Sequence, residues 1–94
     1  MIEIKQMKEG TKGYFGAFDN GNEAGRMSYT FAGETKMILD HTEVNDAYRG
    51  KNIGKKILME LVTYARENNI KIIPLCPFAR SVFDRLEELR DVLL

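Results

Sequence analysis

The stretch YRGKNIGKK, residues 48–56, combines two glycines with four cationic side chains directly ahead of an apolar pattern with helical spacing. Lysine and arginine attract phosphate groups, and glycine lets a ligand approach the backbone closely. The N-terminus of a helix adds unpaired N–H groups and a partial positive charge. The stretch therefore predicts a site for a phosphate-bearing ligand, and the alternative is a solvated basic turn.

Three other side chains could take part in chemistry: His41, Glu43 and Cys76. A histidine can exchange a proton at physiological pH, and a glutamate two residues further along a strand lies on the same face, so either could serve as a general base. Cys76 precedes Pro77 at the expected start of a helix, where a thiol can have a lowered pKa and act as a nucleophile. The alternatives are a hydrogen-bonded histidine, a solvated carboxylate and a packed, inert thiol.

Two common phosphate-binding patterns do not fit residues 48–56. The P-loop has four residues between its glycines and a hydroxyl residue after its lysine. Here three residues separate Gly50 from Gly54, and Lys56 stands at the hydroxyl position. The dinucleotide-binding pattern G-x-G-x-x-G fails as well, because it needs a glycine at position 52 and is expected after the first strand. The sequence therefore excludes these two classes of nucleotide site.

The pattern of apolar residues predicts the elements that position these side chains. Four runs with the composition and alternation of strands fill the N-terminal half: 2–8, 13–19, 25–33 and 36–44. The period then becomes that of a helix, with an apolar face formed by Ile53, Ile57, Leu58, Leu61, Val62 and Ala65. Residues 70–77 predict a short buried strand, and a second helix is expected to begin at Pro77. Its apolar face consists of Val82, Phe83, Leu86, Leu89 and Leu93.

The order of these elements indicates the fold class. The fourth strand, the first helix and the fifth strand form a βαβ unit, which is expected to be a right-handed crossover between parallel neighbours. Short turns join the first four strands, which favours an antiparallel meander. We therefore predict an α/β (α+β) protein with the order β-β-β-β-α-β-α and a mostly antiparallel sheet. The length predicts a single domain over residues 1–94.

Composition narrows the classes of function. The formal net charge is zero, which argues against a nonspecific nucleic-acid binder, because such proteins carry a basic excess. No apolar run approaches the roughly 20 residues of a membrane span, and the first residues lack the apolar core of a signal peptide. A single cysteine excludes a disulfide within the chain. We expect a cytoplasmic protein with no metal site and with neither nucleic acid nor a membrane as its partner.

Residues 49–54 resemble the acetyl-coenzyme A loop of GNAT-type N-acetyltransferases, which has the pattern Gln/Arg-x-x-Gly-x-Gly/Ala between a strand and a long helix. Arg49 and Gly54 match the ends of this pattern, and Asn52 replaces its first glycine. After glycine, asparagine tolerates the left-handed conformation best, so a cradle is still expected. From about Asp40 to Phe83 the chain is similar to small single-domain members of the family. The resemblance implies a minimal GNAT fold, with the fourth and fifth strands parallel and splayed, and acetyl-CoA as ligand or acetyl donor.

The resemblance also implies where the cofactor and the reacting groups would lie. The backbone from Val44 to Asp46 would bind the pantetheine arm between the splayed strands, as an added strand would. His41 and Cys76 would lie near the thioester, and the predicted catalytic residues are Cys76, His41 and Glu43. The predicted cofactor-binding residues are Val44, Asn45, Asp46, Arg49, Gly50, Lys51, Asn52, Ile53, Gly54, Lys55, Cys76, Pro77, Phe78, Arg80, Ser81 and Phe83.

Two departures from typical members bear on the function. Alignment on Ala79 puts Cys76 where an asparagine is usual, and Phe83 where a tyrosine donates a proton to the departing thiolate. Only EGTK separates the first two runs, where two helices usually form part of the acceptor wall, so an open side suited to a protein or peptide is expected. We therefore expect acetyl-CoA-dependent acetyl transfer to an amine, either directly or through Cys76. The alternatives are an acetyl-CoA-binding module or sensor with little or no turnover, and an interaction domain without a ligand.

Overall fold

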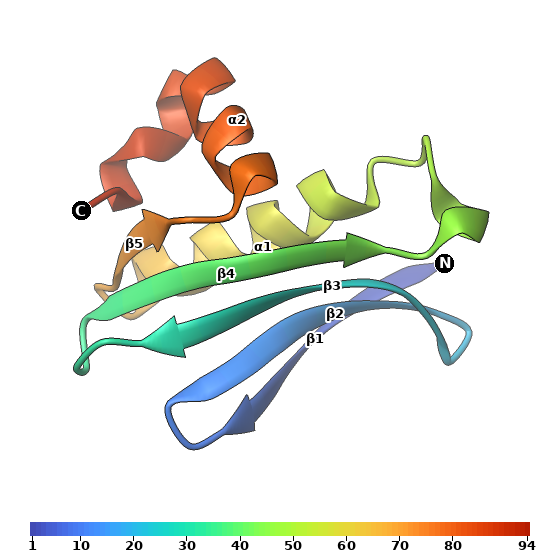
Figure 1. Ribbon diagram of the computed structural model, residues 1–94, viewed down its shortest axis with the longest axis horizontal. Helices are drawn as coiled ribbons and strands as arrows, with labels where there is room; N and C mark the ends of the chain where they lie inside the picture. Colours follow the sequence, from blue (N-terminus) through green and yellow to red (C-terminus); the bar gives the residue numbers. More distant parts are fainter.

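The computed structural model describes residues 1–94 and contains the predicted order of strands and helices (Figure 1). The strands are β1 Ile2–Glu9, β2 Lys12–Asp19, β3 Asn22–Phe31, β4 Lys36–Val44 and β5 Lys71–Pro74. The α-helices are α1 Ile53–Glu67 and α2 Pro77–Arg85, and two 3₁₀ helices span Asp46–Tyr48 and Glu87–Val92. The prediction of the order β-β-β-β-α-β-α is therefore confirmed.

The strands form one sheet in the order β1-β2-β3-β4-β5. Neighbouring strands from β1 to β4 pair antiparallel, and β4 pairs parallel with β5. Helix α1 makes the connection between the two parallel strands and lies behind the sheet in the view of Figure 1. The fold is thus the mixed α+β arrangement that the sequence predicts.

The two parallel strands separate after a short paired segment. Their pairing ends at Leu39 and Pro74, and the N–H groups of Leu75 and Cys76 both donate to the carbonyl of Leu39. A register shift in the β3–β4 pairing falls between Ser28 and Tyr29, at the same level of the sheet. Beyond Leu39, β4 continues to Val44 with β3 as its only paired strand. The predicted splay of the fourth and fifth strands is therefore present.

The core lies between α1 and one face of the sheet. The buried face of α1 contains every apolar residue predicted for it, because side chains at helical spacing share one side. These side chains pack in one cluster with Met27 and Tyr29 of β3 and with Met37 and Leu39 of β4. This packing fixes where α1 begins relative to the end of β4.

The second half of the chain differs from the prediction in two places. Helix α2 ends at Arg85, because Leu86 has a non-helical backbone, and Leu89 is buried from a 3₁₀ helix instead. The Arg90 guanidinium donates to the carbonyls of Phe83 and Asp84 and so satisfies groups that the end of the helix leaves unpaired. Strand β5 is shorter than residues 70–77, because the backbone of Cys76 turns toward β4.

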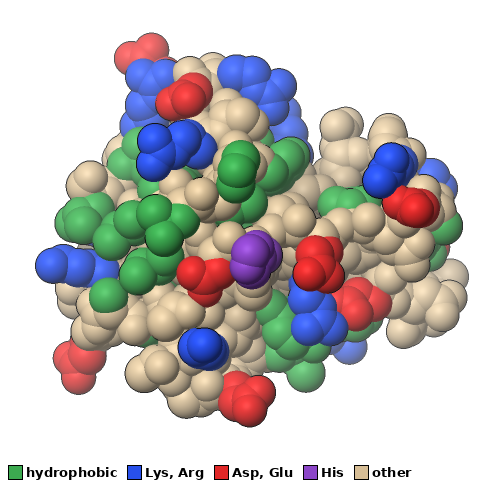
Figure 2. Space-filling view, viewed as in Figure 1, with side chains coloured by type: hydrophobic (Ala, Val, Ile, Leu, Met, Phe, Trp, Pro, Cys, Tyr) green, Lys and Arg blue, Asp and Glu red, His purple; other side chains and the backbone are tan.

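The other face of the sheet is open to solvent. Only a two-residue turn at Gly10 and Thr11 joins β1 to β2, so no helix from this connection covers the sheet. Tyr14, Phe18 and Arg26 are partly exposed on this side. Figure 2 shows the single histidine (purple) at the surface, close to acidic side chains (red). No helix of the chain has the length and apolar character needed to cross a membrane.

Candidate functional site

The loop between β4 and α1 changes direction at two residues with positive φ. Gly50 has φ 81° and Asn52 has φ 59°, and α1 begins directly after Asn52. Glycine adopts such angles without a steric penalty, and asparagine tolerates the left-handed region better than most residues. Asn52 therefore has the left-handed conformation that asparagine tolerates, directly before the first residue of α1.

The first turn of α1 leaves backbone donors free. No side chain caps the helix, and the first helical bond in this turn is from the N–H of Lys56 to the carbonyl of Asn52. The N–H groups of residues 52–55 therefore have no backbone or side-chain partner. Such donors, together with the helix dipole, favour a phosphate or carboxylate oxygen at this position.

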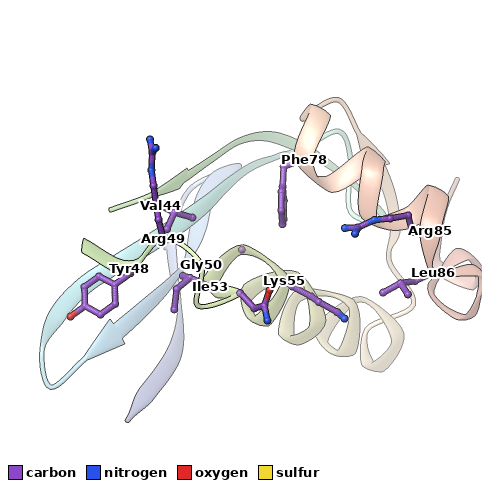
Figure 3. A pocket seen from close by; sticks show the side chains of 11 residues that line it. Val44, Tyr48, Arg49, Gly50, Ile53, Lys55, Phe78, Arg85 and Leu86 are labelled. Carbon is purple, nitrogen blue, oxygen red and sulfur yellow. The ribbon is translucent and has the colours of Figure 1, made fainter. Parts of the chain in front are cut away.

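A pocket of about 500 Å³ opens beside this helix start, between α1 and α2 (Figure 3). This volume lies in the range of small-molecule and cofactor sites. The lining residues are Val44, Tyr48, Arg49, Gly50, Asn52, Ile53, Gly54, Lys55, Phe78, Arg85 and Leu86. They include three cations and no carboxylate, so the electrostatics of the pocket favour an anion.

The three cations differ in their partners. Arg49 forms an ion pair with Asp46, with 3.0 Å between Nε and Oδ1, and both side chains are exposed. Lys55 and Arg85 have no carboxylate partner in the structure. An exposed ion pair is weak and exchanges readily for a ligand. All three side chains can therefore contribute charge to a bound phosphate.

Gly54 and Phe78 bring the two helices together at the pocket. A Cβ atom placed on Gly54 would lie 2.7 Å from Cζ of Phe78, which is closer than real Cβ contacts. Figure 3 shows the Phe78 ring hanging from α2 toward the start of α1. Gly54 is therefore required for the approach of α2 as well as for access to the helix N-terminus.

The loop is anchored to the β2–β3 hairpin by a side-chain hydrogen bond. The Tyr48 hydroxyl donates to Oδ2 of Asp19 at 2.9 Å. This hydrogen bond is the main cause that lowers the pKa of the Asp19 carboxyl, and it raises the pKa of Tyr48. The loop is also held by the N–H of Asn45, which donates to the carbonyl of Ala24.

Half of the predicted cofactor-binding residues line the pocket. Those that line it are Val44, Arg49, Gly50, Asn52, Ile53, Gly54, Lys55 and Phe78. Those outside its lining are Asn45, Asp46, Lys51, Cys76, Pro77, Arg80, Ser81 and Phe83. Among the latter, the N–H of Asn45 is already bonded to Ala24, so it is not free to bind pantetheine as an added strand would. Phe83 is a core residue with 1% of its surface exposed.

The predicted catalytic side chains lie on different sides of β4. Cys76 is buried at the start of α2, and its Sγ lies 2.9 Å from Oγ1 of Thr42 in β4. His41 and Glu43 flank Thr42 and are exposed, since neighbouring side chains on a strand point to opposite faces. The structure therefore brings His41 and Glu43 to the open face and places Cys76 beneath it, and it does not bring His41 and Cys76 together.

Three pocket residues are absent from the predicted set: Tyr48, Arg85 and Leu86. Arg85 follows Phe78 by seven residues, which is two helical turns, so the two side chains share one face of α2. That spacing is a signal the sequence does contain. The spacing would identify Arg85 only if Phe78 were already known to face the pocket. The direction of Phe78 depends on how α2 packs against α1.

The arrangement can hold an elongated anionic ligand with an apolar portion. Free N–H groups and cations surround the loop, while Val44, Ile53 and Phe78 supply apolar contacts. Beside the pocket, the edge of β4 beyond Leu39 has no strand paired to it. A peptide-like chain could add to this edge by backbone hydrogen bonding.

Both the sequence and the fold of this chain are similar to those of known proteins. A family model described as GCN5-related N-acetyl-transferase matches residues 14–92. A GCN5-like protein from Staphylococcus aureus, solved by NMR, is 38% identical, with a TM-score of 0.72, over 98% of this chain and 87% of that chain. A comparison with curated protein sequences finds no match.

Two more distant structures share the fold. A ribosomal-protein-alanine N-acetyltransferase from Brucella melitensis biovar Abortus 2308 is 23% identical, with a TM-score of 0.71, over 83% of this chain and 62% of that chain. An aminoglycoside 6'-N-acetyltransferase complexed with coenzyme A is 18% identical, with a TM-score of 0.62, over 72% of this chain and 39% of that chain. The match of the family model across most of the chain and the 38% identity with the Staphylococcus aureus protein lead to one conclusion: the chain belongs to the GCN5-related N-acetyltransferase family.

Proposed function

We propose that this protein binds acetyl-CoA in the pocket between α1 and α2 and transfers the acetyl group to an amine. Acyl transfer is the chemistry of the family to which the chain belongs. A fold neighbour complexed with coenzyme A supports the choice of ligand. The acceptor class we propose is a protein or peptide amine, because the open face of the sheet leaves room for a large molecule.

The start of α1 is the observation that carries this proposal. The free N–H groups of residues 52–55 lie at the end of the splayed strand β4, in a pocket lined by three cations and no carboxylate. A pyrophosphate at this position would accept hydrogen bonds from the backbone and gain from the helix dipole. The pantetheine arm would then extend along the unpaired edge of β4 toward Thr42 and Cys76.

Two routes for the acetyl group are compatible with the positions of the side chains. In the direct route, His41 or Glu43 on the open face removes a proton from the acceptor amine, which attacks the thioester carbonyl. In the covalent route, Sγ of Cys76 attacks that carbonyl, the proton of its thiol passes to the sulfur of coenzyme A, and the amine then attacks the acetyl-cysteine. The Thr42 hydroxyl, at 2.9 Å from Sγ, is placed to relay that proton.

A second candidate function is an acetyl-CoA-binding module or sensor that does not turn over. Phe83 occupies the position expected for a tyrosine proton donor, and its side chain is buried and has no hydroxyl. In the direct route the departing thiolate therefore needs another proton source. This observation favours slow transfer or none.

The test of function is the consumption of thioester by the full chain. Acetyl-CoA is incubated with the protein and a panel of amines that includes peptides with free N-termini, and release of the coenzyme A thiol is followed. We expect release that depends on both protein and amine. Saturable binding of acetyl-CoA without release across the panel would support the binding module and contradict the transferase. Glu43→Gln and His41→Ala separate the two candidate bases, because only loss of the true base lowers the rate.

A further inference from the structure

Arg85 and Lys55 face the same pocket from two different helices. Lys55 lies in the first turn of α1, and Arg85 is the last residue of α2. Neither side chain has a carboxylate partner. Figure 3 shows Arg85 extending from α2 into the space between the helices, with the Phe78 ring between it and Gly50. The pocket therefore has a second cationic end, separate from the loop at Gly50.

The guanidinium of Arg85 is available for a ligand. Its Nε donates to the carbonyl of Ser81 at 3.4 Å, which is a long contact, and its two terminal nitrogens have no acceptor. A guanidinium with free terminal nitrogens can bind two oxygens of one phosphate at once. The side chain is exposed, so its position does not depend on burial in the core.

The helix dipole favours the position of Arg85 in α2 but not the position of Lys55 in α1. A cation in the last turn of a helix, such as Arg85 in α2, is favoured by the dipole. A cation in the first turn, such as Lys55 in α1, is disfavoured by it. The first turn of α1 contains no acidic residue to compensate. A bound anion between Lys55 and Arg85 accounts for both positions.

We infer that Arg85, with Lys55, binds the 3'-phosphate of coenzyme A and makes the protein specific for free coenzyme A thioesters. The inference rests on the proposed function, in which the pyrophosphate occupies the loop end of the pocket. A ribose separates the pyrophosphate from the 3'-phosphate, and the latter carries about −1.5 to −2 charges at neutral pH, as other phosphate monoesters do. The apolar side chains of Phe78 and Leu86 provide contacts for the adenosine. Dephospho-coenzyme A and thioesters on a phosphopantetheine arm lack the 3'-phosphate and should bind more weakly.

The experiment compares coenzyme A with dephospho-coenzyme A by calorimetric titration of the full chain. Hydrogen bonds to a charged group predict that the wild type binds coenzyme A about tenfold more tightly or better. Arg85→Gln should remove most of this preference, because it should lower the affinity for coenzyme A much more than the affinity for dephospho-coenzyme A. Arg85→Lys should keep part of it, because the charge remains and the fork is lost.

Lys36→Gln is the matched control, since Lys36 is an exposed cation at the start of β4 and lies outside the lining of the pocket. It should leave the preference intact. Two results would overturn this inference and leave the proposed function standing. One is equal affinity of the wild type for coenzyme A and dephospho-coenzyme A. The other is an equal loss of both affinities in Arg85→Gln. Failure of the wild type to bind either ligand would overturn the proposed function, and this inference with it.

Discussion

The ring of Phe78 occupies the space that a side chain at Gly54 would need. A Cβ on Gly54 would lie 2.7 Å from Cζ of Phe78, so α1 and α2 can approach at the pocket only because residue 54 is glycine. Both residues line the same pocket. The glycine thus has two roles, since it exposes the backbone N–H groups and sets the position of the helix that forms the opposite wall.

Replacement of Gly54 tests this contact. We expect Gly54→Ala to lower the free energy of unfolding by about 1–3 kcal/mol, as overpacking does. It should also weaken acetyl-CoA binding, because the Phe78 ring is displaced into the pocket. Urea unfolding and calorimetric titration measure the two effects. The double variant with Phe78→Leu should recover part of the stability, and an additive loss in the double variant would show that the two residues do not oppose each other.

Asn52 provides a second test through its backbone. Its φ of 59° is in the left-handed region, where a residue with a Cβ and no polar side chain is strained. Asn52→Ala should therefore lower the free energy of unfolding by about 1 kcal/mol, whereas Asn52→Gly should be neutral within about 0.5 kcal/mol. Equal effects of the two substitutions in urea unfolding would mean that the backbone angle is not the cause.

The hydrogen bond from Tyr48 to Asp19 predicts that the free energy of unfolding depends on pH. The hydrogen bond from Tyr48 is the largest cause that lowers the pKa of Asp19 below its ordinary value of 3.8. A carboxyl with a lowered pKa stabilises the folded state above its unfolded pKa, and this contribution is lost as the pH falls through the folded pKa. Tyr48→Phe should therefore be less stable than the wild type at about pH 6, and the difference should shrink at about pH 2.

Thermal unfolding of the two proteins across this range measures the difference. A difference that stays constant with pH would show that Tyr48 acts through packing alone. Asp19→Asn in the same series isolates the charge, because it keeps the size of the side chain and removes the ionisable group.

If the acetyl group passes through the thiol of Cys76, an acetylated form of the protein should be detectable. Incubation of the wild type with acetyl-CoA in the absence of an amine should then raise the intact mass by one acetyl group. Cys76→Ser, which keeps the size of this buried side chain, should show no stable adduct under the same conditions. Thr42→Val removes the hydroxyl contact at 2.9 Å from Sγ and should slow formation of the adduct. Transfer to an amine by Cys76→Ser at the wild-type rate would favour the direct route.

The sequence predicts those parts of the fold that depend on local pattern. The buried face of α1, from Ile53 to Ala65, follows from helical spacing, and the conformation of Asn52 follows from its residue type. The parallel pairing of β4 with β5 follows from the βαβ order. The residues of the loop between β4 and α1 are contiguous in the sequence, so this half of the candidate site can also be predicted from local pattern.

The remaining parts depend on contacts between distant segments. Arg85 reaches the pocket only because α2 packs with Phe78 against Gly54, and α2 stops there because Leu86 leaves the helical conformation. The hydrogen bond between Asp19 and Tyr48 joins residues 29 positions apart. The separation of His41 from Cys76 depends on which way each side chain of β4 points. Spacing in one sequence does not determine such relationships, because they follow from the packing of whole elements.

Amide chemical shifts report whether the start of α1 binds acetyl-CoA. The full chain, labelled with ¹⁵N, is titrated with acetyl-CoA, and the backbone resonances are followed. We predict saturable shifts at concentrations of about 1 μM to 1 mM, the usual range for enzyme substrates, and the largest shifts at the N–H groups of residues 52–55. No saturable shift up to about 1 mM, or shifts confined to residues outside the pocket, would show that acetyl-CoA does not bind at the start of α1.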